Sequence, residues 1–131
     1  MNCFWEDYLN SILLIDDDLK QLWLREAVLS AADFKITRAA SAEAALALLR
    51  SISSSEQPDA IVTDHLLPGA SGAEFVMELR SIDPHVPVFV LTGLTAAEPE
   101  YDGLNVTFLD KPCPPEDLIR LLRETLAGQP A

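Results

Sequence analysis

Short apolar runs recur along the chain and alternate with longer segments in which apolar residues return every three or four positions. The strongest runs cover residues 12–15, 60–63, 88–91 and 106–109, and a shorter strand-like segment covers 35–39. Such runs predict β-strands, and the nearly continuous ones are typical of parallel strands buried on both faces. Because helical patterns stand between them, the chain is predicted to be an α/β domain.

The helical patterns cover residues 19–32, 41–50 and 74–81, and a last one begins at Pro115. In the first, apolar pairs at 23/24, 27/28 and 31/32 predict one stripe that faces the core. Ser41 is the predicted N-cap of the second helix, and Gly128 is expected to end the last. In the third, four apolar residues are expected to face inward: Phe75, Val76, Leu79 and Ile82.

Five strands joined by right-handed crossovers predict a doubly wound parallel sheet with the flavodoxin-like order 2-1-3-4-5. The first and third strands then lie side by side at the centre. The stretch between the fourth and fifth strands makes a poor helix, because Pro99 disfavours a helical Glu98 and Gly103 further lowers the helix propensity. We therefore predict a shortened or irregular fourth helix.

Composition narrows the possible functions. With 131 residues, 49% hydrophobic and 23% charged, the chain is predicted to form one domain. The net charge of −12 argues against direct binding of nucleic acid, whose phosphates repel such a surface. The sequence has no apolar run long enough for a membrane span and no basic signal region at its start. Cys3 and Cys113 are too few for a disulfide framework, so we expect a cytoplasmic protein with protein partners.

Polar side chains follow four of the predicted strands at the point where each strand ends. Asp16 and Asp17 close the first run, Asp64 closes the third, Thr92 closes the fourth, and Lys111 follows the fifth. The working crevice of an open parallel sheet lies outside the carboxyl ends of its strands, so these side chains should converge at one edge. Three carboxylates, one hydroxyl and one ammonium suit a divalent cation together with a phosphoryl group.

Four motifs at these strand ends resemble those of the receiver (response regulator) domains of bacterial two-component signalling, the CheY-like proteins. They are ILLIDDD, TDHLLPGASG, VFVLTG and FLDKP. Each motif alone is weak, but their order and their positions at strand ends are specific. The resemblance implies a receiver domain over residues 11–127, preceded by an N-terminal extension at 1–10 and followed by a tail at 128–131.

The resemblance also implies a metal site and a phosphorylation site. Asp64 would accept the phosphoryl group. Asp17 would bind Mg²⁺ directly, Asp16 would bind it mainly through water, and Leu66 would offer its backbone carbonyl. The chemistry is consistent with these roles, because crowded carboxylates need a cation and Mg²⁺ prefers one or two carboxylates together with phosphate and water.

Three further residues have implied roles on the other side of the acceptor. Thr92 would bond a phosphoryl oxygen, and Lys111 would supply a point charge to the same group. Phe108 matches the aromatic switch position that lies three residues before this lysine. In this family the Lys111–Pro112 peptide bond would be cis.

Simpler interpretations stand beside these roles. Asp16 to Asp18 would also serve as a helix cap, and Asp64 as the start of a turn. His65 is interpreted as partly exposed filler rather than a metal ligand, because no second His or Cys lies at ligand spacing. Three aromatic residues are assigned to packing rather than to recognition: Phe4, Trp5 and Trp23.

The haloacid-dehalogenase-like phosphatases are an alternative from a different class. Their series of site residues is imitated here by Asp16, Asp18, Thr92 and Lys111. Against them, Lys20 stands where that family places a small or β-branched residue, no acidic pair follows the last of the four, and Asp64 would be unused. A receiver that is not phosphorylated and only binds proteins is a further alternative, although all five chemical positions are filled.

We therefore expect a phosphorylation-dependent signalling receiver rather than an enzyme with an external product. A sensor histidine kinase or a phosphotransfer protein would donate the phosphoryl group, with Mg²⁺ as cofactor. These 131 residues contain no output domain, so the chain would act by contact with a downstream protein, alone or within a longer regulator or hybrid kinase. Leu66 and Leu94, where many members carry polar residues, predict a long-lived acyl phosphate.

Overall fold

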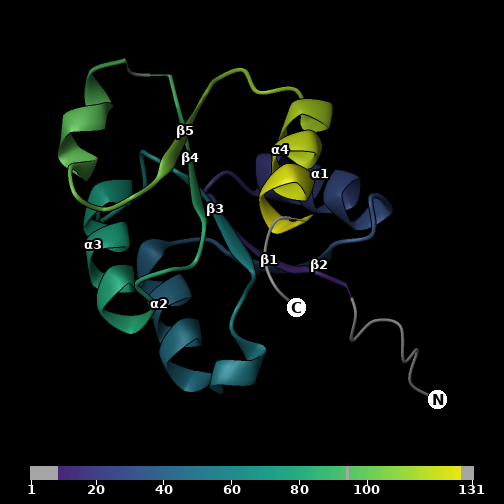
Figure 1. Cartoon of the computed structure of the whole chain (residues 1–131). Helices are drawn as coiled ribbons and strands as arrows, with labels where there is room; N and C mark the ends of the chain where they lie inside the picture. Colours follow the sequence, from purple (N-terminus) through teal and green to yellow (C-terminus); the bar gives the residue numbers. More distant parts are fainter. Residues whose placement is uncertain (1–8, 94, 128–131) are drawn as a thin grey trace.

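Five parallel strands form one sheet in the order β2-β1-β3-β4-β5, with helices on both faces (Figure 1). The computed structural model describes residues 9–93 and 95–127. The strands are β1 (Ser11–Ile15), β2 (Lys35–Ala39), β3 (Ala60–Asp64), β4 (Val88–Thr92) and β5 (Thr107–Asp110). The helices are α1 (Leu19–Ala31), α2 (Ala42–Ser51), α3 (Gly72–Ile82) and α4 (Pro115–Ala127), with 3₁₀ helices η2 (Ser54–Glu56) and η3 (Thr95–Tyr101). The predicted fold class and strand order are confirmed.

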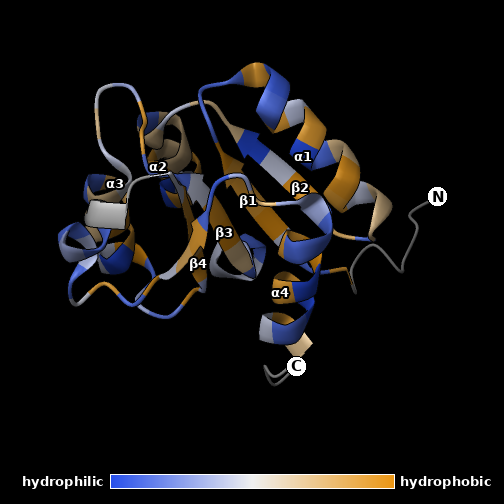
Figure 2. Ribbon diagram, turned by 90° about the horizontal axis from the view of Figure 1, so that it is seen from above, coloured by the Kyte–Doolittle hydropathy of each residue, from blue (hydrophilic) through white to orange (hydrophobic). Residues whose placement is uncertain are grey.

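Two apolar layers enclose the sheet. Helices α2 and α3 cover one face, where Leu13 and Ile15 of β1 point, and helices α1 and α4 cover the other, where Ile12 and Leu14 point. Figure 2 shows the apolar strands between these helices. Since both faces are covered, every residue of β3 and β4 is buried, including the polar residues at their carboxyl ends. The burial of the sheet therefore holds the site residues in place.

Side-chain caps fix where two helices begin. The hydroxyl of Ser41 accepts the backbone N–H of Ala44 at 3.0 Å, which confirms the predicted N-cap of α2. Ser71 and Glu74 form a reciprocal capping box, so α3 begins at Gly72, two residues earlier than predicted. Its predicted inward face is confirmed, with three residues buried and one partly buried: Phe75, Val76, Leu79 and Ile82.

The predicted core-facing stripe of α1 is wrong. Trp23 and Leu24 are 61% and 56% exposed, whereas Leu22 and Leu29 are buried. Asp18 caps the helix at the edge of the sheet, and docking there turns the helix so that positions 22, 25 and 29 face inward. Trp23 is therefore not a packing residue within the described part of the chain, and a charged residue, Arg25, takes a place on the inner face.

No α-helix lies between β4 and β5 in the part of this connection that the structure describes. The short η3, with Pro99 inside it, stands there instead, as the sequence predicts. Two anchors hold it. The Tyr101 ring is buried against the α2–α3 layer, and the Arg80 guanidinium donates to the backbone carbonyls of Leu104 and Asn105 at 2.8 and 2.9 Å.

Gly72 stands where three segments meet. Its N–H donates to the carbonyl of His65 at 2.8 Å. A Cβ at this position would lie 3.0 Å from the carbonyl oxygen of Asp64 and would overlap the hydroxyl of Tyr101. Only a glycine lets the start of α3, the end of β3 and η3 approach so closely.

Replacing Gly72 by Ala should destabilise the fold by about 1–3 kcal/mol, because the added methyl forces neighbouring backbone apart. Chemical denaturation would measure the loss. Gly93→Ala is the matched control, since a Cβ there meets nothing within 4 Å. Adding Tyr101→Phe to Gly72→Ala should recover part of the loss by removing the overlapping hydroxyl. Equal midpoints for Gly72→Ala and the parent would contradict this account.

Candidate functional site

Three carboxylates gather at the carboxyl edge of β1 and β3. In the pairing of β1 with β3, Ile15 lies opposite Thr63. The next residue on each strand, Asp16 and Asp64, therefore lies beside the other. Both are buried, at 2% and 7% exposure, while Asp17 is exposed. One oxygen from each carboxylate lies within 4.8 Å of the other two. The structure thus brings together the three acidic residues that the sequence predicts for this edge.

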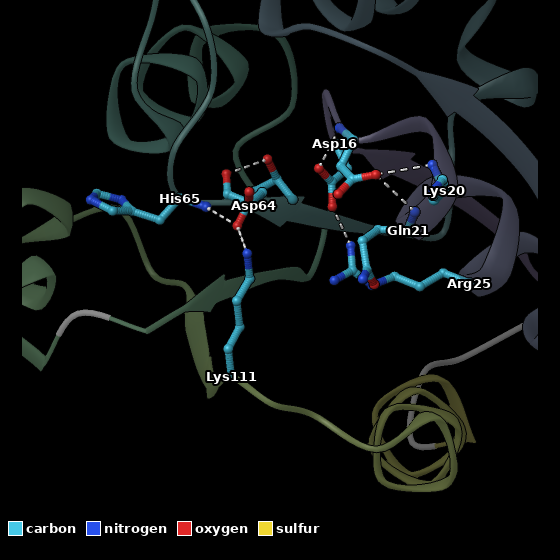
Figure 3. A network of polar contacts seen from close by, with 9 residues as sticks. Asp16, Lys20, Gln21, Arg25, Asp64, His65 and Lys111 are labelled. Atoms are coloured by element: carbon cyan, nitrogen blue, oxygen red, sulfur yellow. Dashed lines mark hydrogen bonds and ion pairs between the residues drawn. The ribbon is translucent and has the colours of Figure 1, made fainter.

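Two cations bind these carboxylates from different elements (Figure 3). Lys111 Nζ lies 2.6 Å from Asp64 Oδ1, and it extends from the segment just after β5. Arg25 Nη1 lies 2.6 Å from Asp16 Oδ2, and it reaches down from α1. Lys111 was predicted at this edge. Arg25 was missed, because the sequence pattern placed it on the outer side of its helix.

Backbone hydrogen bonds orient the acidic side chains further. The N–H of His65 donates to Asp64 Oδ1 at 3.1 Å, and the N–H of Asp18 donates to Asp16 Oδ1 at 2.9 Å. The Asp18 carboxylate itself accepts the N–H groups of Lys20 and Gln21 at the start of α1. The capping interpretation therefore holds for Asp18, which leaves Asp16 and Asp17 available to the site. The phosphatase alternative needs Asp18 as a site residue, and this capping role counts against it.

The remaining predicted residues lie on or just after β3, β4 and β5. Thr92 ends β4 and is buried, and its carbonyl accepts the N–H of Lys111 at 3.0 Å. The side chain of Leu66 is 64% exposed beside the carboxylates. Phe108 is partly buried on β5. The Lys111–Pro112 bond is cis, as the resemblance implies. Leu94 lies outside the described residues.

A cavity of about 750 Å³ opens over the carboxylates. Its polar wall carries the acidic residues, Arg25 and Lys111, and its apolar wall comes mainly from α1 and the start of α4. The apolar lining includes Leu24, Val28, Leu29, Leu91, Pro112 and Leu118. A small anion would therefore meet both cations at one end of a partly apolar cleft.

The acidic residues suit a magnesium ion. All three donors are carboxylate oxygens, which are ligands that Mg²⁺ prefers, and the exposed Asp17 leaves room for the water molecules this ion retains. The carboxylates of Asp16 and Asp64 are each paired with a basic side chain, which holds them in place at the carboxyl edge of the sheet. The donor set fits a hard divalent cation better than a metal that prefers thiolate or imidazole ligands.

His65 is buried rather than partly exposed, so that expectation is wrong. Only 4% of the residue is exposed, and its Nδ1 lies 2.7 Å from the hydroxyl of Tyr101. The Tyr101 ring in turn meets Phe108 edge-on, with centroids 5.2 Å apart. The burial follows from Gly72, which leaves space for the tyrosine against the end of β3. Nothing in the sequence pattern pairs residues 65 and 101, which lie on separate elements.

Within the described residues, no helix is long and apolar enough to cross a membrane.

Residues 12–123 match the profile of the family described as the response regulator receiver domain. The response regulator MprA of Mycolicibacterium vanbaalenii is 30% identical over 88% of this chain. That match takes in 49% of MprA, and the chain spans about half the length of the first curated relatives that it matches.

Solved structures share the fold over nearly the whole chain. The chemotaxis response regulator CheY4 of Vibrio cholerae is 28% identical, with a TM-score of 0.80 over 90% of this chain and 99% of that one. A response regulator receiver protein from Sinorhizobium medicae is 29% identical, with a TM-score of 0.79 over 92% of this chain and 96% of that one. Both show that this chain has the fold of response regulator receiver proteins.

The raised pKa of the Tyr101 phenol should make the free energy of unfolding fall at high pH. Its burial, together with the charges of Glu100 and Asp64, raises the pKa of the phenol well above its usual range. The folded protein therefore keeps a proton that the unfolded chain loses above about pH 10, so this contribution is complete below that pH and is lost as the pH rises. Denaturation of the parent and of Tyr101→Phe between about pH 9 and 11 would measure it.

We expect the parent to lose stability more steeply over this range than the phenylalanine variant. Near neutral pH the free energy of unfolding of the variant should be about 0.5–1.5 kcal/mol lower than that of the parent, since the variant lacks the hydrogen bond to His65. Other groups titrate in both proteins, so their effects cancel when the two free energies of unfolding are subtracted. Parallel plots of stability against pH would contradict this account, because they would show that the Tyr101 phenol has the same pKa in the folded and unfolded states.

Proposed function

The chain belongs to the response regulator receiver domain family, and we propose that its signal is a phosphoryl group carried on Asp64. The observation that carries this proposal is the position of that carboxylate. It lies buried at the centre of the edge, 2.6 Å from Lys111 and beside Asp16 and Asp17. A nucleophilic carboxylate forms an acyl phosphate, which is reactive enough to serve as a temporary mark.

The transfer joins Asp64 to the phosphorus of a phosphohistidine donor. A carboxylate oxygen forms the new O–P bond while the N–P bond breaks, and the departing imidazole keeps the electron pair. Lys111 supplies a fixed positive charge to the phosphoryl oxygens. Thr92, at the end of the adjacent strand β4, bonds one of those oxygens. Catalysis of this kind depends mostly on positioning and charge.

Four residues are the proposed ligands of a magnesium ion. Asp17 and Asp64 would bind it directly, Asp16 would bind it mainly through water, and Leu66 would offer its backbone carbonyl. When bound, the ion neutralises charge on the transferring phosphoryl group. The support for this set is the closeness of the three carboxylates and the exposure of Asp17, which leaves access from the cavity.

The proposed readout runs through the β4–β5 side of the site. Thr92 and Phe108 are the switch residues, and Phe108 already contacts Tyr101 of η3. A shift of Thr92 toward a phosphoryl group would alter the space around this pair of rings. The connection between β4 and β5 and the ring of Phe108 are then the surface that changes for a downstream partner.

The proposed partners are proteins. The donor is a sensor histidine kinase or a phosphotransfer protein in the cytoplasm, and the target is a downstream protein. With a net charge of −12, this chain is proposed not to bind nucleic acid itself. The acyl phosphate stays on the protein, so the proposal assigns no reaction with an external product.

Incubation with a small phosphodonor and Mg²⁺ should add one phosphoryl group to the chain, as read by intact-mass analysis. Asp64→Asn should abolish the gain, because an amide does not form the acyl phosphate. Asp102→Asn changes an exposed aspartate outside the cavity lining and should leave the gain intact. An unchanged gain in the Asp64 variant would refute the assignment of the acceptor.

The acyl phosphate should also be long-lived, because the apolar side chain of Leu66 beside the acceptor does not position an attacking water. Leu66→Asn should therefore lose its phosphoryl group severalfold faster than the parent in a mass-resolved time course. Met77→Asn makes the same kind of apolar-to-amide change at an exposed position on α3, away from the cavity, and should not. Equal lifetimes for parent and Leu66→Asn would count against the idea.

A further inference from the structure

Arg25 lies on the inward face of α1, between two buried leucines. Leu22 and Leu29 are 3% and 1% exposed, and Arg25 stands three positions after the first and four before the second. Residues at these spacings share one face of a helix, so the Arg25 side chain runs toward the sheet and its guanidinium reaches the carboxyl edge. Only 18% of the side chain is exposed.

The guanidinium occupies one of the two oxygens of Asp16. Arg25 Nη1 lies 2.6 Å from Oδ2, while Oδ1 accepts the backbone N–H of Asp18 at 2.9 Å. The Asp16 side chain is 3% exposed, and a buried carboxylate is unstable without a compensating charge and hydrogen bonds. Arg25 therefore supplies at Asp16 a positive charge of the kind a metal ion would bring.

We propose that Arg25 is a positioning residue that competes with Mg²⁺ for Asp16 and thereby sets the Mg²⁺ affinity of the site. The inference rests on the proposed function, since it takes Asp16, Asp17 and Asp64 as the carboxylates that bind the ion. Two cations at one carboxylate repel each other, so binding of the metal weakens the Arg25–Asp16 pair and the pair weakens binding of the metal.

Lys111 makes the same kind of contact at the other buried carboxylate. Its ammonium lies 2.6 Å from Asp64, so both buried aspartates have a basic partner and the exposed Asp17 completes the cluster. A metal ion thus meets a site whose charge is largely compensated by side chains. The affinity of the site for the ion depends on how readily those side chains release the carboxylates, and Arg25 adds to that cost.

The direct test is calorimetric titration of the purified chain with Mg²⁺ alone. Arg25→Met removes the charge and keeps much of the apolar stem, so its dissociation constant should be roughly tenfold lower than that of the parent. Arg50→Met is the matched control. It removes the same charge from an exposed ion pair with Glu78, on the α2–α3 side of the sheet, and should leave the affinity nearly unchanged.

A second measurement separates competition from a purely structural role. Without Mg²⁺, Arg25→Met should melt at a lower temperature than the parent, because Asp16 is left buried and unpaired. Saturating Mg²⁺ should restore most of this difference, since the ion replaces the missing charge. A structural role alone predicts a deficit at least as large with the ion as without it, together with an unchanged or weaker affinity, and that result would overturn the inference.

Arg25→Gln keeps the test decisive if the methionine variant does not fold. The glutamine amide retains one hydrogen-bond donor for Asp16 but carries no charge, so it should also bind Mg²⁺ more tightly than the parent. Failure of the glutamine variant to fold in saturating Mg²⁺, or an affinity no tighter than that of the parent, would refute competition.

The outcomes for the parent chain distinguish this inference from the proposed function. A parent that neither binds Mg²⁺ nor gains a phosphoryl group at Asp64 would contradict the proposed function itself. A parent that does both, alongside Arg25 variants of unchanged affinity, would leave the proposed function standing and remove only the role of Arg25.

Discussion

Mutual repulsion among three carboxylates at one sheet edge is the constraint around which the structure is arranged. The order β2-β1-β3-β4-β5 makes Asp16 and Asp64 neighbours, and burial of the strands denies both full solvation by water. Such an edge is stable only where positive charge reaches it. The cap at Asp18 starts α1 at this edge and so lets Arg25 reach Asp16, while β5 ends where Lys111 can meet Asp64. The charge of the site thus accounts for the placement of elements on both sides of it.

The opposite side of β3 is held by packing and hydrogen bonding. Asp64 is followed by the buried His65, whose ring bonds Tyr101, and the tyrosine ring contacts Phe108. These contacts run from the end of β3 to the connection between β4 and β5, where the described residues form a short 3₁₀ helix in place of an α-helix. A single tyrosine on a short segment therefore does part of the covering that a longer helix would provide. The absence of a side chain at Gly72 makes the arrangement possible.

The sequence predicted the elements and the edge, because buried parallel strands and their terminal polar residues leave a local pattern. The strand order, the inward face of α3 and the irregular segment around Pro99 were all predicted from such patterns. The orientation of α1 was not, because Trp23 and Leu24 are apolar yet face outward, and only docking against the sheet decides the matter. Arg25 was missed for the same reason. His65 was misjudged because its partner, Tyr101, lies 36 positions away and no local pattern links the two.

Arg80 has a mechanical consequence for the connection between β4 and β5. Its guanidinium donates to four backbone carbonyls, those of Asp83, Val86, Leu104 and Asn105, and so ties the end of α3 to the start of β4 and to the entry of β5. The far end of the connection is thereby clamped to the scaffold. These hydrogen bonds limit how far the chain can change its course between Leu104 and the start of β5. The buried ring of Tyr101 stands just before this clamped end, so the contact between η3 and Phe108 is held by side-chain packing on one side and by Arg80 on the other.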